Sequence, residues 1–150
     1  MDVAAMQAHC LAKPGAWPDN PWGHDHPVIK VGEGSAAKIE ARFARLAPRS
    51  SATLGLVPRP ALPPRFVAFA FLGSGGVGVK GGASREAADE WLLRYPGAAS
   101  VMAYIGRSGW NDLAFGGEIP DDELLEAVDE SYRLVVAKLP KKHRPDGWDA

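Results

Sequence analysis

The sequence predicts an α+β fold, in which a single antiparallel sheet is packed by an N-terminal, a middle and a C-terminal helix. Apolar residues recur at helical spacing near both ends of the chain and once in the middle. Between these segments lie two pairs of short apolar runs, each joined by a glycine-containing turn, as in β-hairpins. The length of 150 residues suits one domain with one core. We therefore expect residues 1–150 to form a single domain.

The first predicted element is a short helix over residues 3–12. Val3, Met6 and Cys10 share one helical face, and the run Lys13-Pro14-Gly15 ends the helix. Cys10 is the single cysteine, so the chain has no intramolecular disulfide.

An aromatic loop and a strand should follow. Residues 17–27 contain three prolines and a glycine, so we expect an ordered loop there, anchored by Trp17 and Trp22. Residues 28–31, Val-Ile-Lys-Val, predict a short strand.

The block at about 35–65 differs from its surroundings. It contains five prolines, and residues 30–65 hold seven basic residues against two acidic ones, a local charge of +5. We interpret residues 35–65 as a basic, proline-rich insertion.

The middle of the chain predicts a hairpin followed by a helix. Residues 66–72 are rich in aromatic side chains, and a glycine-rich turn joins them to a second strand at 76–80. Ser84 then provides an N-cap for a helix that ends at Pro96-Gly97.

A second hairpin and a long helix complete the prediction. Strands at 101–105 and 110–115 should pair around Gly106-Arg107-Ser108-Gly109. The final helix should start at Pro120, with acidic residues next to the positive end of its dipole, and stop at Pro140. Its apolar stripe runs through Leu124, Leu125, Val128, Tyr132, Val135, Val136 and Leu139.

Taken in order, these segments resemble the MmcQ/YjbR family of small bacterial proteins. The resemblance covers residues 9–34 and 66–145, and includes Cys10 to Ala16 and Gly78-Val79-Lys80. Its most specific part is a C-terminal set of segments: Trp110 with its strand, Ile119-Pro120-Asp121, Asp129-Glu130-Ser131-Tyr132, and Leu139 to Arg144. The resemblance implies a CyaY-like, double-wing fold and DNA binding, the function with which the family is commonly labelled.

The sequence departs from the family pattern in two places. Typical members lack the block at 35–65. Many members also carry Asn-Lys-x-His-Trp before the late strand, where this chain has Gly106-Arg107-Ser108-Gly109-Trp110. The positive charge and the tryptophan remain, but any role that rests on the asparagine and histidine side chains is in doubt here.

We expect a non-enzymatic DNA-binding protein that contacts phosphate groups through a basic hairpin and a basic helix end. An arginine beside a tryptophan could hold a phosphate and a stacked base. The candidate residues are Lys80, Arg85, Arg107, Trp110, Lys138, Lys141, Lys142 and Arg144. Part of this set has a structural alternative: Trp110 as a sheet-core residue, Arg107 as a solvated turn charge, and the cluster at 138–144 as compensation of the helix dipole.

A second function class stays open. The net charge of −1 argues against a protein-wide electrostatic attraction to nucleic acid. The chain could instead be a binding module for a protein or a small ligand, which would contact the sheet face and the aromatic loop at Trp17 and Trp22.

The sequence offers little for catalysis, a metal or a cofactor. His24 and His26 could share one face of an extended segment, but no further ligand has a matching spacing, so we expect a polar turn. Cys10 lies on an apolar helix face, which favours a buried structural thiol over a nucleophile. The glycines at 73–78 precede a strand and not a helix, as a phosphate-binding loop would require. We therefore expect no enzyme, metal or cofactor.

The chain shows no signal peptide and no long apolar stretch. Its N-terminus lacks a basic segment before an apolar run, and no stretch approaches 18 uninterrupted apolar residues. We expect a cytoplasmic protein without a membrane partner.

Overall fold

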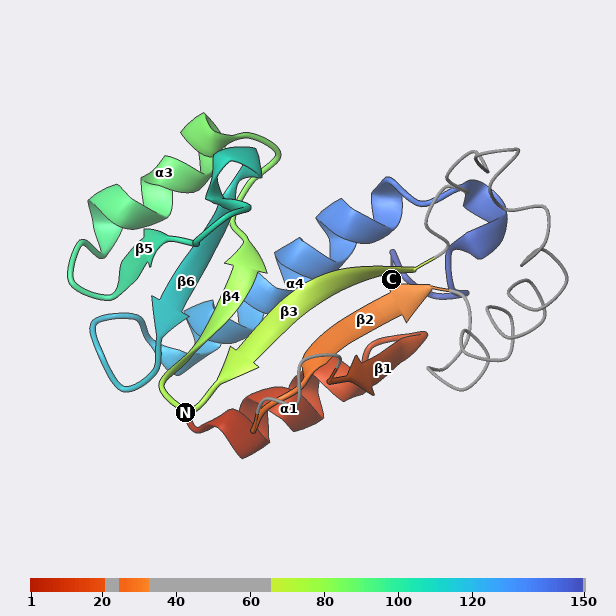
Figure 1. The fold of residues 1–150 in the computed structure, drawn as a ribbon, viewed down its shortest axis with the longest axis horizontal. Coiled ribbons are helices and arrows are strands. Elements are labelled where there is room, and N and C mark those ends of the chain that lie inside the picture. Colours follow the sequence, from red (N-terminus) through yellow and green to blue (C-terminus); the bar gives the residue numbers. More distant parts are fainter. Residues whose placement is uncertain (21–24, 33–65, 150) are drawn as a thin grey trace, which may run out of the picture.

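The computed structural model describes residues 1–20, 25–32 and 66–149, and shows the predicted α+β fold. Within these ranges three α-helices pack on a six-stranded sheet (Figure 1). The helices are α1 (Val3–Leu11), α3 (Arg85–Arg94) and α4 (Asp121–Ala137). The strands are β1 (Ala16–Asp19), β2 (Val28–Gly32), β3 (Phe66–Gly73), β4 (Gly76–Lys80), β5 (Ala99–Val101) and β6 (Trp110–Ala114). Two 3₁₀ turns are η2 (Gly106–Ser108) and η3 (Lys141–His143).

Part of the prediction lies outside the described residues. This applies to the insertion predicted at 35–65, to Trp22 and to His24.

The sheet has the strand order β1-β2-β3-β4-β6-β5, and every neighbouring pair is antiparallel. The two predicted hairpin pairings are confirmed: β3 pairs with β4, and β5 with β6. Because β6 inserts between β4 and β5, the second pair extends the first into one continuous sheet.

The helix starts follow from local hydrogen bonds and charge. The Asp2 side chain accepts a hydrogen bond from the Ala5 backbone N–H at the start of α1. Ser84 does the same for Ala87 at the start of α3, as predicted. Helix α4 has no side-chain cap, but three acidic residues occupy its first turn, where they stabilise the positive end of the dipole.

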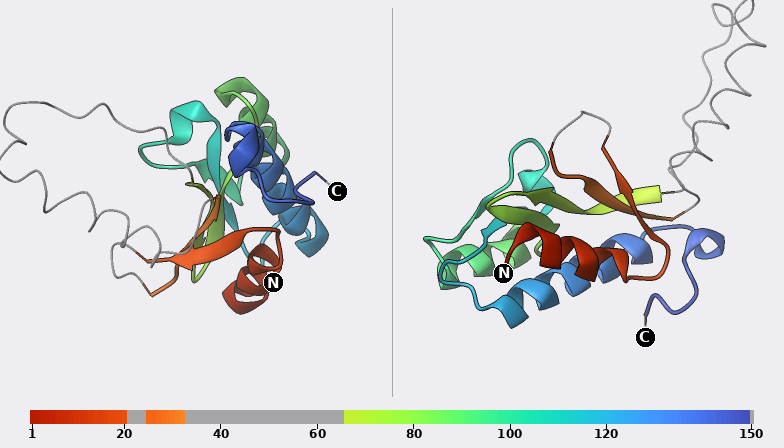
Figure 2. Two further views of the ribbon diagram at one scale, coloured as in Figure 1. Left: turned by 90° about the vertical axis from the view of Figure 1, so that its right-hand side faces the viewer. Right: turned by 90° about the horizontal axis from the view of Figure 1, so that it is seen from below.

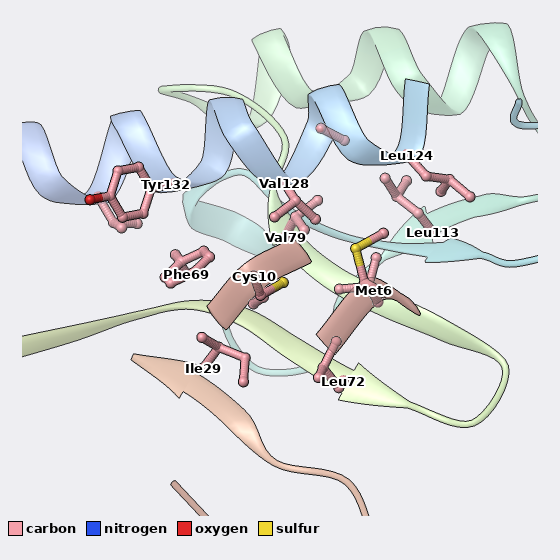
Figure 3. Close-up of a cluster of buried hydrophobic side chains, with 14 of the residues drawn as sticks. Met6, Cys10, Ile29, Phe69, Leu72, Val79, Leu113, Leu124, Val128 and Tyr132 are labelled. Carbon is pink, nitrogen blue, oxygen red and sulfur yellow. The ribbon is translucent and has the colours of Figure 1, made fainter. Parts of the chain in front are cut away.

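The core lies between the sheet and helices α1 and α4, which cover the same face (Figure 2). Phe69 of β3 packs edge to face on Tyr132 of α4, with ring centroids 5.2 Å apart. Met6 and Cys10 of α1 fill the space beside them, and all four side chains are buried (Figure 3). The Tyr132 hydroxyl donates to the Pro14 carbonyl at 2.6 Å, which ties α4 to the turn after α1.

The loop prediction for residues 17–27 is wrong at its start. Residues 16–19 form β1, which pairs with β2 and places Pro18 opposite Ile29. A strand at the edge of a sheet needs hydrogen-bond donors on only one side, so it tolerates a proline that would break an inner strand.

The strand prediction for residues 101–105 is also wrong beyond Val101. Strand β5 is Ala99–Val101, after which the chain turns away from β6. The Ile105 N–H donates to the Ala103 carbonyl at 2.7 Å, and Tyr104 has a φ of 66°. Strand β5 therefore ends four residues before the predicted end at Ile105, although the apolar run continues to that residue.

None of the helices in the described part of the chain is both long and apolar enough to cross a membrane.

Candidate functional site

Lys80 lies where the end of β4 meets the turn η2. Its Nζ donates a hydrogen bond to the Ser108 carbonyl at 2.8 Å and lies 5.9 Å from the centroid of the Trp110 ring. The residue is only 5% exposed. Burial lowers the pKa of Lys80, and the nearby charge of Lys138 lowers it further. The Lys80 ammonium therefore holds the tip of the second hairpin and lies near the Lys138 ammonium at the C-terminal end of α4, and it is shielded from solvent.

Arg85 is held by acceptors of the same turn. One guanidinium nitrogen donates to the Gly106 carbonyl at 2.7 Å and to the Trp110 carbonyl at 3.1 Å. The second donates to the Asn111 side chain, and Nε donates to Asp89 at 2.8 Å. These bonds fasten η2 and the start of β6 to α3. The predicted phosphate contact at Arg85 would have to compete with them.

Arg144 caps the C-terminal end of α4. It donates to the carbonyls of Ala137 at 2.7 Å and Leu139 at 2.9 Å, and its guanidinium lies 5.6 Å from the Trp148 ring centroid. The last carbonyls of a helix have no partner within the helix, so an arginine here stabilises its end. For Arg144 the geometry therefore agrees with the alternative interpretation, in which this residue compensates the end of the helix.

Four of the predicted cations are exposed: Arg107, Lys138, Lys141 and Lys142. We call these four the exposed cations. In the described ranges none of them forms a salt bridge. Arg107 lies in η2, Lys138 ends α4, and the other two lie in η3. In Figure 1 the teal turn at 106–108 and the blue end of α4 both lie along the upper side of the molecule.

Trp110 begins β6 on the face of the sheet opposite α1 and α4. It is half-buried and packs edge to face with Phe71, at 5.4 Å between ring centroids. The next residue, Asn111, is buried on the helical face, where its amide donates to the Ala88 carbonyl at 2.9 Å. Trp110 is thus neither a core residue nor fully solvated. Its aromatic surface lies between Lys80 and the open face.

The geometry of η2 depends on Gly109. This residue has a φ of 101°, and a Cβ atom there would lie 2.6 Å from the Gly82 carbonyl oxygen. A glycine is therefore required at this position, between Arg107 and Trp110.

Two polar anchors were not singled out from the sequence. Ser131 accepts from the Lys80 backbone N–H at 2.9 Å and donates to the Phe69 carbonyl at 2.7 Å, so it joins α4 to two strands. Asn111 joins β6 to α3 and to Arg85. Strand alternation could have placed Asn111 inside the protein, since it lies between the outward residues Trp110 and Asp112.

Cys10 and His9 are both engaged within the protein, by burial in one case and by a hydrogen bond in the other. Burial raises the pKa of Cys10 to about 12, so its thiol stays protonated at neutral pH. His9 hydrogen-bonds Asp129 at 2.7 Å, and Lys13 pairs with the same carboxylate. Within the described ranges, no group of three or more His, Cys, Asp or Glu side chains could hold a metal ion.

Comparison with known proteins identifies the family. A family model described as YjbR matches residues 11–134. The chain belongs to the YjbR family. The YjbR match ends before Lys138, so it includes the tip at Arg107 but not the basic end of the chain.

A solved YjbR-type structure has the same fold. The crystal structure of the Deinococcus radiodurans protein DR2400, with a DUF419 domain, superposes with a TM-score of 0.66 over 95% of this chain and 84% of that one. The two sequences are 17% identical, so the likeness concerns the fold alone. Among curated proteins, no significant relative of this chain was found.

Proposed function

We propose that this YjbR-family protein binds DNA without catalysing a reaction, and that the four exposed cations contact the phosphate groups. The observation that carries the proposal is the position of Lys80. Because Lys80 bonds to Ser108 and also lies near Lys138, the hairpin tip and the helix end are close in space, although Arg107 and Lys138 are 31 positions apart in the sequence. A strand of DNA could contact both.

The charge state of these residues supports phosphate binding. Exposed cations without an internal partner give up only hydration when they bind a phosphate, whereas Arg85 and Arg144 would also give up internal hydrogen bonds. We therefore assign contact to the exposed cations, and assign to Lys80, Arg85 and Arg144 the task of holding their backbone in place.

The net charge of −1 does not oppose this proposal. Phosphate contacts act over a Debye length of about 10 Å at 0.1 M salt, so a local cluster can bind while the rest of the surface is acidic. The net charge of −1 does imply that DNA binding is weak and that the affinity falls steeply as the salt concentration rises.

The proposal that the protein catalyses no reaction rests on the environment of two groups that could act as nucleophiles, at Cys10 and Lys80. The Cys10 thiol is buried and protonated, and the Lys80 ammonium donates to a carbonyl. Activity against the nucleic acid would be seen as cleavage or modification of the DNA in the titration, and it would contradict this part.

The test is a titration of a fluorescent DNA duplex at low salt with the wild-type protein and with neutralised variants. Arg107→Gln and the double variant Lys141→Gln/Lys142→Gln should each weaken binding severalfold. Arg94→Gln is the matched control, because it removes one positive charge at the far end of α3, where Arg94 pairs with Glu123. If Arg94→Gln weakened binding as much as Arg107→Gln, and the double variant weakened it only in proportion to its two lost charges, only net charge would matter and the assigned site would be rejected.

A further inference from the structure

The face of the sheet opposite α1 and α4 carries a row of residues that the proposed phosphate contacts do not use. The strand register places Phe71, Gly78, Asp112 and Ser100 side by side across β3, β4, β6 and β5. The adjacent row, Leu72, Val77, Leu113 and Ala99, is buried in the core. Since successive side chains in a strand point to opposite faces, the first row belongs to the open face.

This row borders a groove of about 560 Å³, which opens on the outer face beside the β3–β4 turn. The groove has an apolar side at Phe71, a polar side at Asp112 and Ser100, and a wall formed by residues 96–99. We call it the Asp112 groove. Its volume lies within the range of small-ligand sites, so a nucleobase would fit inside it.

The Met102 side chain covers the sheet at Gly78. A Cβ atom at this position would lie 2.9 Å from Met102 Sδ and 3.1 Å from an Asp112 carboxylate oxygen, so Gly78 has no room for a side chain. A ring in the groove would therefore lie beside Met102, over the part of the sheet that Gly76, Ala114 and Asp112 line.

Asp112 provides an acceptor that the protein itself does not use. Within the described residues it forms neither a hydrogen bond to another protein group nor a salt bridge, and desolvation raises the pKa of its carboxyl. The carboxylate remains a strong acceptor for paired N–H groups of a ligand.

The Asp112 groove is continuous with the candidate DNA site through Trp110. Asp112 follows Trp110 by two residues on the same face of β6, a separation of roughly 7 Å along the strand. Trp110 in turn lies beside Lys80, which holds the turn that carries Arg107. Along this side of the molecule the cations are therefore followed first by an aromatic ring and then by a carboxylate.

We propose that the Asp112 groove takes one unpaired base of a DNA strand whose phosphates lie on the exposed cations, and that guanine is the preferred base. This inference rests on the proposed function and deepens it, because it makes single-stranded DNA the preferred partner. The face of Trp110 provides a surface for an adjacent base.

The hydrogen-bond donors of the bases account for the preference for guanine and for the preference for single-stranded DNA. A carboxylate accepts from two N–H groups at once, and guanine presents two neighbouring donors, N1–H and N2–H, on its Watson–Crick edge. In a duplex this edge is occupied by cytosine, so only an unpaired guanine can offer it. Thymine offers a single N–H flanked by two carbonyls, which the carboxylate repels.

The test uses intact protein and three probes at one salt concentration: an oligonucleotide of alternating dG and dT, an oligo-dT of equal length, and a duplex that contains the first. The wild-type protein should bind the dG/dT strand about tenfold more tightly than oligo-dT or the duplex. Asp112→Asn should abolish this preference and leave the affinity for oligo-dT unchanged or higher. Asp122→Asn is the matched control, an exposed acid on the first turn of α4 that should keep the preference.

A second variant tests the groove itself. Gly78→Ala should reduce the affinity for the dG/dT strand, because its Cβ would clash with Met102 and displace that side chain into the groove, while circular dichroism verifies that the fold is kept. Salt-dependent binding of all three probes with equal affinity, unaffected by Asp112→Asn, would overturn this inference and leave the proposed function standing. No binding of any probe at low salt would overturn both.

Discussion

Replacing Arg85 by lysine should destabilise the protein although the charge is kept. The guanidinium donates to the carbonyls of Gly106 and Trp110, to the Asn111 side chain and to Asp89. A lysine ammonium has no fixed fork and can replace about one of the three bonds that fasten η2 and β6 to α3.

The size of the effect follows from the two bonds that are lost. A hydrogen bond from a charged group contributes about 1.5–3 kcal/mol, and the Arg85 side chain is 23% exposed, so water satisfies part of what is lost. We therefore expect a loss of about 2–4 kcal/mol. For a chain of this length that corresponds to a fall in Tm of roughly 6–12 °C.

Urea denaturation followed by circular dichroism measures this loss. Arg133→Lys is the matched control, because Arg133 makes one surface ion pair with Glu130 and both side chains are about half exposed. It should change the free energy of unfolding by less than about 0.5 kcal/mol. If Arg85→Lys loses no more than the control but binds DNA less tightly, the assignment of Arg85 to the scaffold is wrong and phosphate contact is the better account.

Two further predictions concern titratable groups of the α1–α4 region. Because burial raises the pKa of Cys10 to about 12, a thiol reagent at pH 8 should leave the folded protein unmodified and modify it fully in denaturant; rapid modification of the native protein would contradict the buried assignment. At Asp129 desolvation opposes ionisation, but hydrogen bonds from Lys13 and His9 outweigh it and hold the pKa below its ordinary value. The stabilisation it provides is therefore full above about pH 4 and is lost as the pH falls through the folded-state pKa. Asp129→Asn should lower Tm at pH 7, and its difference from wild type should narrow towards pH 3; a difference that stays constant would refute this.

The elements of the fold could be predicted where periodicity and end signals agree. Helix α4 has both an acidic first turn and a continuous apolar stripe, and its bounds lie within about two residues of the prediction. The two errors have local causes. Pro18 hides β1 because a proline breaks inner strands but not edge strands, and the turn at Tyr104 interrupts an apolar run that otherwise continues.

The candidate site was harder to predict, because the sequence shows charges but not their acceptors. Lys80, Arg85 and Arg144 all donate to backbone carbonyls, and any residue can provide a carbonyl. No residue pattern could therefore separate these three from the exposed cations. The open-face row at Asp112 depends on a strand order in which β6 lies between β4 and β5, which the chain order does not indicate.

The central claim is that the exposed cations bind DNA phosphates, and the salt dependence of duplex binding tests it most directly. The slope of log K against log salt concentration is about −0.9 for each phosphate contact, so four contacts predict a slope of about −3.6. The double variant Lys141→Gln/Lys142→Gln should reduce it by about 1.8, and Arg94→Gln should leave it unchanged. A duplex that fails to bind at low salt, or a slope that the double variant does not change, would contradict the account.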